Sequence, residues 1–281
     1  MRCELTHDAR AFWPDVRAFL AADPVVHNVL ATNIEARSRG ALADEGTPTF
    51  ASVRDDDGRI VGVAMHTPPF NAYLSRMPVP AVAEVARALR SAGVELPGVT
   101  STTAEARAFA ELWCADGGGY EVGMSQRIHV LGELVPPTGV AGRPRVAGAS
   151  DRDLLVAWTL AFGAETGVPG SADAMRRAVN ARLAEGLLHV WCRGDEVVSY
   201  AGRNTPNAGV VRVGPVYTPP EQRGNGYASA LVAAVSRVAR DGAGVRDVCL
   251  YTDLANPTSN KIYAQVGYRP LCDVTAYSFR G

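Results

Sequence analysis

The sequence is poor in several features that mark particular classes of protein. Its 281 residues contain a single lysine, Lys261, and five cysteines that are scattered along the chain without a C-x-x-C pair. Disulfide and zinc frameworks need paired cysteines, so we expect neither, and scattered thiols favour a reducing cytoplasm. The five histidines have no partner at metal-ligand spacing, and we therefore expect no metal site.

Long apolar runs and an excess of one charge are also missing. No stretch approaches about 18 uninterrupted apolar residues, and no apolar signal segment opens the chain, so we expect neither a membrane span nor secretion. The net charge of -1 gives no electrostatic reason to expect binding to nucleic acid or to an acidic membrane surface. A hydrophobic share of 47% indicates a globular protein with a real core, and the length favours two domains.

A segment rich in proline and glycine divides the chain. Residues 134–149 contain three prolines and three glycines, a composition that suits an exposed connector. We therefore expect a first domain at residues 1–134, a linker at 135–149 and a second domain at 150–281.

The two halves share an order of sequence signals. Strand-like runs at 49–53 and 59–66 flank a turn in the first half, and runs at 188–192 and 197–204 do so in the second, at an offset of about 138 residues. Each half then continues with strand, helix, strand, helix, a Gly-Tyr pair and a further strand. We interpret this order as an internal duplication of one α/β (α+β) fold. The alternative is two unrelated α/β domains that share ordinary hairpins.

The first half is shorter where the two halves differ most. The stretch from Thr67 to Gly119 spans 52 residues, whereas the stretch from Thr205 to Gly267 spans 62. The first half passes from residues 76–80 directly into an amphipathic helix, while the second has a glycine-rich turn at the corresponding place. We therefore expect the first domain to lack a phosphate site.

The turn at residues 222–228, Gln-Arg-Gly-Asn-Gly-Tyr-Ala, has the features of an anion site. It follows a strand-like run at 210–218, which Gly214-Pro215 interrupts, and it precedes a helical pattern. The first turn of a helix presents unpaired N–H groups and a positive dipole end, and glycines let the backbone approach an anion closely. Arg223 adds a forked, charged donor. These features predict a diphosphate site.

The spacing within this turn does not name the diphosphate. A Walker P-loop needs a lysine after its glycines, and a dinucleotide fingerprint needs G-x-G-x-x-G, whereas here Gly224 and Gly226 are followed by Ala228. An ordinary left-handed turn before a helix is the plainer alternative.

The elements that follow the turn narrow the choice of diphosphate ligand. A strand-like run at 245–252 is followed by Asn256-Pro257, a typical helix start, and later by Gly267, a typical helix end. Turn and helix together resemble two motifs of the GNAT superfamily of acyltransferases, [QR]-x-x-G-x-[GA] and N-P-x-[SA]-x-x-x-Y-x-x-x-G-[FY]. The matching residues are Arg223, Gly226 and Ala228, then Asn256, Pro257, Ser259, Tyr263, Gly267 and Tyr268. The resemblance covers residues 150–281 well and the first half only through the duplication.

The resemblance implies a fold, a co-substrate and a reaction. We expect two tandem GNAT-like folds, each a mixed, mostly antiparallel twisted sheet flanked by helices, the first a degenerate copy that binds no CoA. The second is expected to bind acetyl-CoA and to transfer its acetyl group to a primary amine, on a small molecule or a peptide, by direct attack in a ternary complex. A non-catalytic acyl-CoA-binding sensor or partner-binding module is the alternative. A ligase or nucleotide hydrolase is disfavoured, because a phosphate-binding lysine and metal carboxylates are missing.

The resemblance also gives individual residues expected roles. Gly214-Pro215 would splay its strand from the neighbouring one, which admits the pantetheine arm. Tyr263 is the expected general acid and Glu165 the preferred general base, with a core aromatic and a solvated loop charge as the alternatives. The expected cofactor-binding residues are Val216, Tyr217, Thr218, Arg223, Gly224, Asn225, Gly226, Tyr227, Ala228, Asn256 and Asn260.

Two further expectations concern partners. The acidic residues of the acceptor side mildly favour a cationic acceptor; they are Asp151, Asp153, Glu165 and Asp173. We expect the first domain to form a wall of the acceptor site, to cover an edge strand, or to make a homodimer contact.

Overall fold

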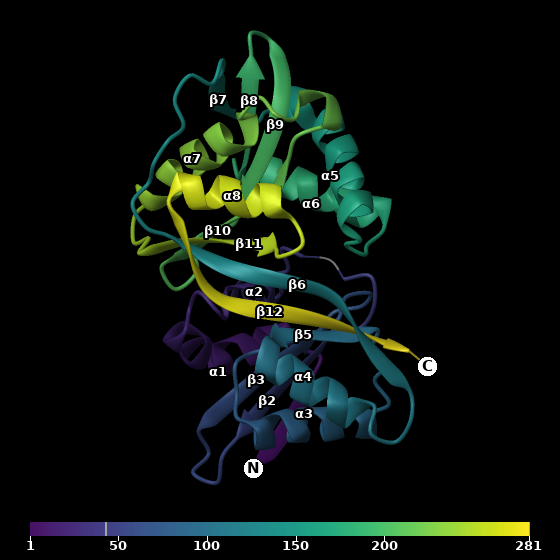
Figure 1. The fold of residues 1–281 in the computed structure, drawn as a ribbon. Helices are drawn as coiled ribbons and strands as arrows, with labels where there is room; N and C mark the ends of the chain where they lie inside the picture. The colour runs from purple at the N-terminus through teal and green to yellow at the C-terminus, as the bar shows by residue number, and fades with distance from the viewer. Residues whose placement is uncertain (43, 281) are drawn as a thin grey trace. The chain divides into compact units, whose positions relative to one another are not determined.

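The computed structural model describes residues 1–42 and 44–280. Contacts divide the chain into two compact units (Figure 1). The first unit holds residues 1–128 and 253–255 and the end of the chain from residue 272, and the second unit holds residues 129–252 and 256–271. No helix in the described part of the chain is long and apolar enough to cross a membrane.

The first unit is a mixed, mostly antiparallel sheet with helices on both faces. Its strands are β1 (Arg2–Thr6), β2 (Thr49–Arg54), β3 (Ile60–His66), β4 (Ala72–Leu74), β5 (Gly98–Thr102) and most of β6 (Gly119–Leu131) and β12 (Tyr268–Arg280). Its helices are α1 (Ala9–Ala22), α2 (Asn28–Ser38), α3 (Val79–Ser91) and α4 (Thr103–Trp113). The strands follow the order β1-β2-β3-β4-β5-β12, in which only β4 and β5 run parallel.

Alternation along the strands explains why helices cover both faces. Phe50 of β2 packs with the buried side chains of α1 and α2, whereas its neighbour Ala51 packs with those of α3 and α4. Successive strand residues point to opposite faces, so a strand that is buried on both sides needs apolar residues at consecutive positions. Strand β2 meets this need, because five of its six residues are buried.

The last strand of the chain completes the sheet of the first unit. Val274 to Ser278 of β12 pair antiparallel with β5, and Arg127 of β6 forms a bidentate ion pair with Asp273, at 2.5 and 2.9 Å. At Gly98 of β5 a side chain would collide with the Tyr277 carbonyl, so this close approach requires glycine. The contacts thus differ from the boundary expected from the sequence, which kept residues up to 281 in the second domain.

The second unit repeats the architecture of the first. Its strands are β7 (Arg143–Val146), β8 (Leu188–Arg193), β9 (Glu196–Arg203), β10 (Val210–Tyr217) and β11 (Asp247–Asp253). Its helices are α5 (Arg152–Thr166), α6 (Ala172–Ala184), α7 (Tyr227–Arg240) and α8 (Pro257–Val266), with short 3-10 turns η1 (Ala149–Asp151) and η2 (Pro220–Gln222). The order is β11-β10-β9-β8-β7, again with one parallel pair, β10 and β11.

This repeat confirms the order of elements that the sequence signals predicted in both halves. Both hairpins form, at β2–β3 and at β8–β9. The expected linker differs, however, because its residues 143–146 form β7, an edge strand paired with β8. In the second unit, Val190 of β8 faces the α5–α6 core and Trp191 faces the α7–α8 core.

Candidate functional site

Strands β10 and β11 pair only at their first residues. The parallel register joins three pairs of residues, Val210–Asp247, Val211–Val248 and Arg212–Cys249. Beyond Arg212, β10 pairs with β9 alone, and that register shifts between Val213 and Val216. The shift surrounds Gly214-Pro215, whose proline lacks a backbone donor. The expected parting of these two strands is therefore confirmed, and it leaves the end of β10 without a strand partner on the β11 side.

The turn between β10 and α7 presents unshared backbone donors. Helix α7 begins at Tyr227, and its N-cap Gly226 supplies no side chain to cap it. Within the described residues, none of the N–H groups of residues 224–228 donates to a protein acceptor. Asn225 Nδ2 donates to the carbonyl oxygens of Gln222, at 3.1 Å, and Arg223, at 3.3 Å. The turn is thus held by its own side chain while its amides stay available to an anion.

Glycine is required at two positions of this turn. Gly224 and Gly226 have φ values of +83° and +77°, in the left-handed region that side-chain-bearing residues rarely adopt. An added Cβ at Gly226 would also lie 3.1 Å from Val140 Cγ2. Position 226 is therefore restricted both by its backbone conformation and by packing.

The guanidinium of Arg223 is largely engaged within the protein. Its Nη2 donates to both carboxylate oxygens of Glu165, at 2.7 and 3.0 Å, and its Nε donates to the Thr218 carbonyl at 2.9 Å. The guanidinium carbon also lies 5.8 Å from the centre of the Tyr217 ring. Glu165 was expected as a general base and Arg223 as a diphosphate ligand, and the structure joins the two by an ion pair.

Tyr217 and Thr218 of the expected cofactor site are fixed by neighbours. The buried Tyr217 donates its hydroxyl proton to Glu165 at 3.1 Å, and burial, followed by this carboxylate, raises the pKa of Tyr217. The Thr218 hydroxyl bonds to Ser199 Oγ at 2.8 Å. Val216 pairs with Ala201 of β9 and adjoins the register shift.

Tyr263 lies on α8 inside the core of the second unit. The residue is 9% exposed, and its ring meets that of Tyr268 edge to face, at 6.2 Å between centres. Burial raises the pKa of Tyr263 to about 12, so the hydroxyl is protonated at neutral pH. That hydroxyl makes no hydrogen bond with any described residue, whereas the Tyr268 hydroxyl bonds to Ser236 at 2.7 Å. The proton of Tyr263 is therefore not committed to a protein acceptor.

Asn256 and Asn260 hold the start of α8, and Asn260 also links it to β11. Asn256 Oδ1 accepts from the Ser259 N–H at 3.0 Å, which makes it the N-cap that the sequence predicted. Asn260 Oδ1 accepts from the Thr252 hydroxyl at 2.6 Å, and its Nδ2 donates to the Asn256 carbonyl at 2.9 Å. Both side chains have a structural role in the protein alone.

Two of the four acidic residues thought to favour a cationic acceptor are neutralised. Asp151 accepts two hydrogen bonds from Arg145, at 2.6 and 2.8 Å, and Arg145 holds the pKa of Asp151 below its usual range. Glu165 is paired with Arg223. The argument for a cationic acceptor consequently loses half of its carboxylates.

The first unit has a very different turn at the position of residues 222–228. Strand β4 ends at Leu74 and α3 starts at Val79, with Pro78 as the N-cap and Pro80 in the first helical turn. Neither proline has an N–H group, so this helix start has two fewer backbone donors for an anion.

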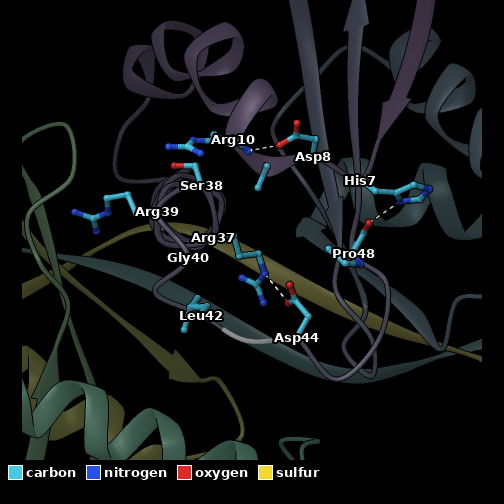
Figure 2. A pocket seen from close by; sticks show the side chains of 11 residues that line it. His7, Asp8, Arg10, Arg37, Ser38, Arg39, Gly40, Leu42, Asp44 and Pro48 are labelled. Atoms are coloured by element: carbon cyan, nitrogen blue, oxygen red, sulfur yellow. Dashed lines mark hydrogen bonds and ion pairs between the residues drawn. The ribbon is translucent and has the colours of Figure 1, made fainter.

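The first unit instead contains a polar cavity of 430 Å³ (Figure 2). It lies between the start of α1 and the end of α2, and none of the motif residues lines it. Its polar groups are partly satisfied within the protein, because Arg37 pairs with Asp44 at 2.7 Å and His7 bonds to the Pro48 carbonyl at 2.7 Å. No group of three potential metal ligands occurs among the described residues.

Comparison with known proteins identifies the second unit. Residues 156–268 match the model of the acetyltransferase (GNAT) family. This unit belongs to the GNAT family. A search of curated proteins found no match.

Solved structures share the fold over the whole chain. A GCN5-related N-acetyltransferase from Sphaerobacter thermophilus superposes with a TM-score of 0.64 at 16% identity, over 100% of this chain and 96% of its own. A tandem GNAT protein from the clavulanic acid biosynthesis pathway gives 0.58 at 16% identity, over 99% and 98%. A structural-genomics protein from Drosophila gives 0.68 at 15% identity, over 97% and 96%. The chain therefore has a tandem GNAT fold.

Sequence reasoning missed the ion pair between Glu165 and Arg223. The partners are 58 residues apart, on α5 and on the turn before α7, and no local pattern links them. It also missed the strand β7 and the return of β12 to the first unit.

Proposed function

We propose that this protein is an acetyl-CoA-dependent N-acetyltransferase that modifies a primary amine of a small molecule or a peptide in the cytoplasm. The observation that carries the proposal is the row of unshared N–H groups at residues 224–228, at the N-terminus of α7 and next to the parted strands. Such a row suits the diphosphate of coenzyme A. Membership of the second unit in the GNAT family supports the same reaction class.

The parted strands offer a place for the rest of the co-substrate. Backbone groups at Val216 and Thr218 would bond to the amides of the pantetheine arm, as an added strand does. Acetyl-CoA supplies an activated acetyl thioester, and a free N–H near Val216 or Tyr217 would stabilise the negative charge that develops on its carbonyl oxygen.

Glu165 and Tyr263 would move the protons. Glu165 takes a proton from the acceptor amine, whose nitrogen forms the new bond to the acetyl carbon. Tyr263 gives its proton to the sulfur as the carbon–sulfur bond breaks. Its pKa of about 12 keeps this proton in place at neutral pH until the thiolate forms.

The remaining site residues are proposed as ligands of acetyl-CoA in the roles that the motifs imply. They are Arg223, Gly224, Asn225, Gly226, Tyr227, Ala228, Asn256 and Asn260. We further propose that the first unit, the degenerate copy, binds no CoA, because its turn lacks both the glycines and two of the amide donors.

The test is turnover rather than binding alone. Release of free thiol from acetyl-CoA is followed with a panel of amines, for the wild type and for Tyr263→Phe. The variant removes only the hydroxyl, so kcat is expected to fall by about 10²–10⁴-fold while CoA affinity stays within about twofold. CoA binding without turnover on any amine would favour the non-catalytic acyl-CoA-binding module instead.

A further inference from the structure

The contact between Glu165 and Arg223 ties an acceptor-side helix to the proposed diphosphate turn. Glu165 belongs to the last turn of α5, and Arg223 precedes the glycines of the turn. Both side chains are about half exposed, at 44% and 49%. The pair therefore lies at the surface of the second unit, where a ligand could reach it.

The geometry of the pair resembles that of an arginine with a bound anion. One edge of the guanidinium, Nη2 and Nε, is committed to Glu165 and to the Thr218 carbonyl. A phosphate that binds in the forked manner needs two guanidinium nitrogens, and Nη1 alone has no partner among the described residues. A forked phosphate contact along the Nη2–Nε edge therefore requires Arg223 to release Glu165 and the Thr218 carbonyl.

Glu165 also holds a second group. It accepts the Tyr217 hydroxyl at 3.1 Å, and Tyr217 stands at the end of β10, immediately before Thr218. Loss of the Arg223 contact would leave Glu165 with this neutral donor only. The carboxylate oxygens that Arg223 had held would then be open to another hydrogen-bond donor, such as the acceptor amine.

We propose that Glu165 is an internal competitor for the diphosphate at Arg223, so that coenzyme A displaces it and thereby frees the carboxylate to act on the amine. This inference rests on the proposed function of the turn.

The competition is expected to change the CoA affinity only slightly. A half-exposed ion pair contributes about 0.2–1 kcal/mol, which corresponds to a change of about 1.4- to 5-fold in affinity. An exchange of this size is reversible at each turnover, as a catalytic cycle requires.

Calorimetric titration with CoA tests the inference in a double-mutant cycle. Glu165→Gln is expected to bind CoA about 1.4- to 5-fold more tightly than the wild type, because the neutral amide loses the ionic part of its contact with Arg223. In the Arg223→Ala background, the same substitution is expected to change nothing. The S-acetylpantetheine affinity, measured by ligand-observed NMR, should be equal in wild type and Glu165→Gln, because this probe lacks the diphosphate.

A control separates competition from simple repulsion between negative charges. Glu221 lies in η2, just before Arg223, and makes no ion pair with Arg223 in the described structure, so Glu221→Gln removes a nearby charge without freeing the guanidinium. Its effect is expected to be equal with Arg223 and with Ala at position 223. Glu165→Ala repeats the cycle in case the glutamine side chain bonds to Arg223.

Each outcome decides one claim. Equal tightening by Glu165→Gln in both backgrounds overturns the competition, because repulsion then accounts for it. Unchanged affinity in both Glu165 variants also overturns it, while wild-type CoA binding keeps the proposed function intact. No heat from the wild type with CoA would instead remove the proposed function.

Discussion

The two units share one order of strands and helices but differ at the turn that leads into α3 or α7. In the first unit this turn is short and contains Pro78, with Pro80 just inside the helix. In the second it is longer and contains Gly224 and Gly226, both in the left-handed region. The helices that follow are similar, since α3 and α7 both pack an apolar face against their sheet.

The difference shows that the fold and the ligand site depend on different properties of the chain. The fold depends on apolar residues at strand and helix spacing, which both units keep. An amide anion site depends on free N–H groups and on backbone conformations that glycine permits, which proline removes. The two units also differ at the tyrosine of the second motif. Tyr263 lies four residues before Gly267 in the second unit, whereas Ala115 lies four residues before Gly119 in the first. A unit can thus keep the architecture while the turn before its helix lacks these glycines and amide donors.

The largest expected effect is at Gly226. Gly226→Val places a β-branched residue at a φ of +77° and against Val140, so the amides of the turn must shift. We expect CoA affinity to fall by about 100-fold, from roughly 3 kcal/mol of strain and lost hydrogen bonds. The matched change in the first unit, Pro78→Ala, should leave affinity within about twofold, and calorimetry should count one CoA per chain. Two equivalent sites per chain would abolish the contrast between the units.

A smaller effect, on the pH dependence of stability, is expected from histidines that are buried without a hydrogen bond. Neither ring nitrogen of His66 in the first unit, nor Nε2 of His189 in the second, has a partner among the described residues. Burial, and then the charge of Arg203, lowers the pKa of His189 to about 4, from 6.5 in the unfolded chain. The folded state thus binds fewer protons, so stability is fully present above about pH 6.5 and is lost as the pH falls toward 4.

The measurement is urea unfolding at pH 7 and pH 5. For His189 alone, the expected loss over this range is on the order of 2 kcal/mol. His189→Leu should remove this share of the pH dependence, and His66→Leu should remove a share of the same sign, since burial also lowers the pKa of His66. A wild-type protein that is equally stable at both pH values would contradict the assignment.

The smallest expected effect is on the free energy of unfolding, and it concerns the N-caps of α8 and α4, the equivalent helices of the two units. Asn256 caps α8 with its side chain, whereas Thr102 at the start of α4 makes no capping bond and donates to Glu105. Asn256→Ala should lower the free energy of unfolding by about 1 kcal/mol, and Thr102→Ala by less. Urea unfolding of both variants at pH 7 checks this. Equal losses would show that Asn256 does not act as a cap in solution.

Much of the second unit was predictable because its signals are local. The helix bounds at Tyr227 and Pro257, the cap at Asn256 and the break at Gly214-Pro215 follow from residues that act within one turn of the backbone. The domain ranges were harder to predict from the sequence, because strands are defined by partners that lie far away along the chain. Residues 143–146 look like a connector and form β7 once β8 lies beside them.

The sequence by itself determined the repeated order of elements, the GNAT motifs and the absence of a glycine turn in the first half, because each depends on near neighbours in the chain. Only the tertiary structure decided that β12 returns to the first unit, that Asp151 is paired with Arg145, and that Glu165 holds Arg223. These contacts join residues brought together by the packing of helices on sheets. Their energies depend on distance and exposure, which a linear order of residues does not contain.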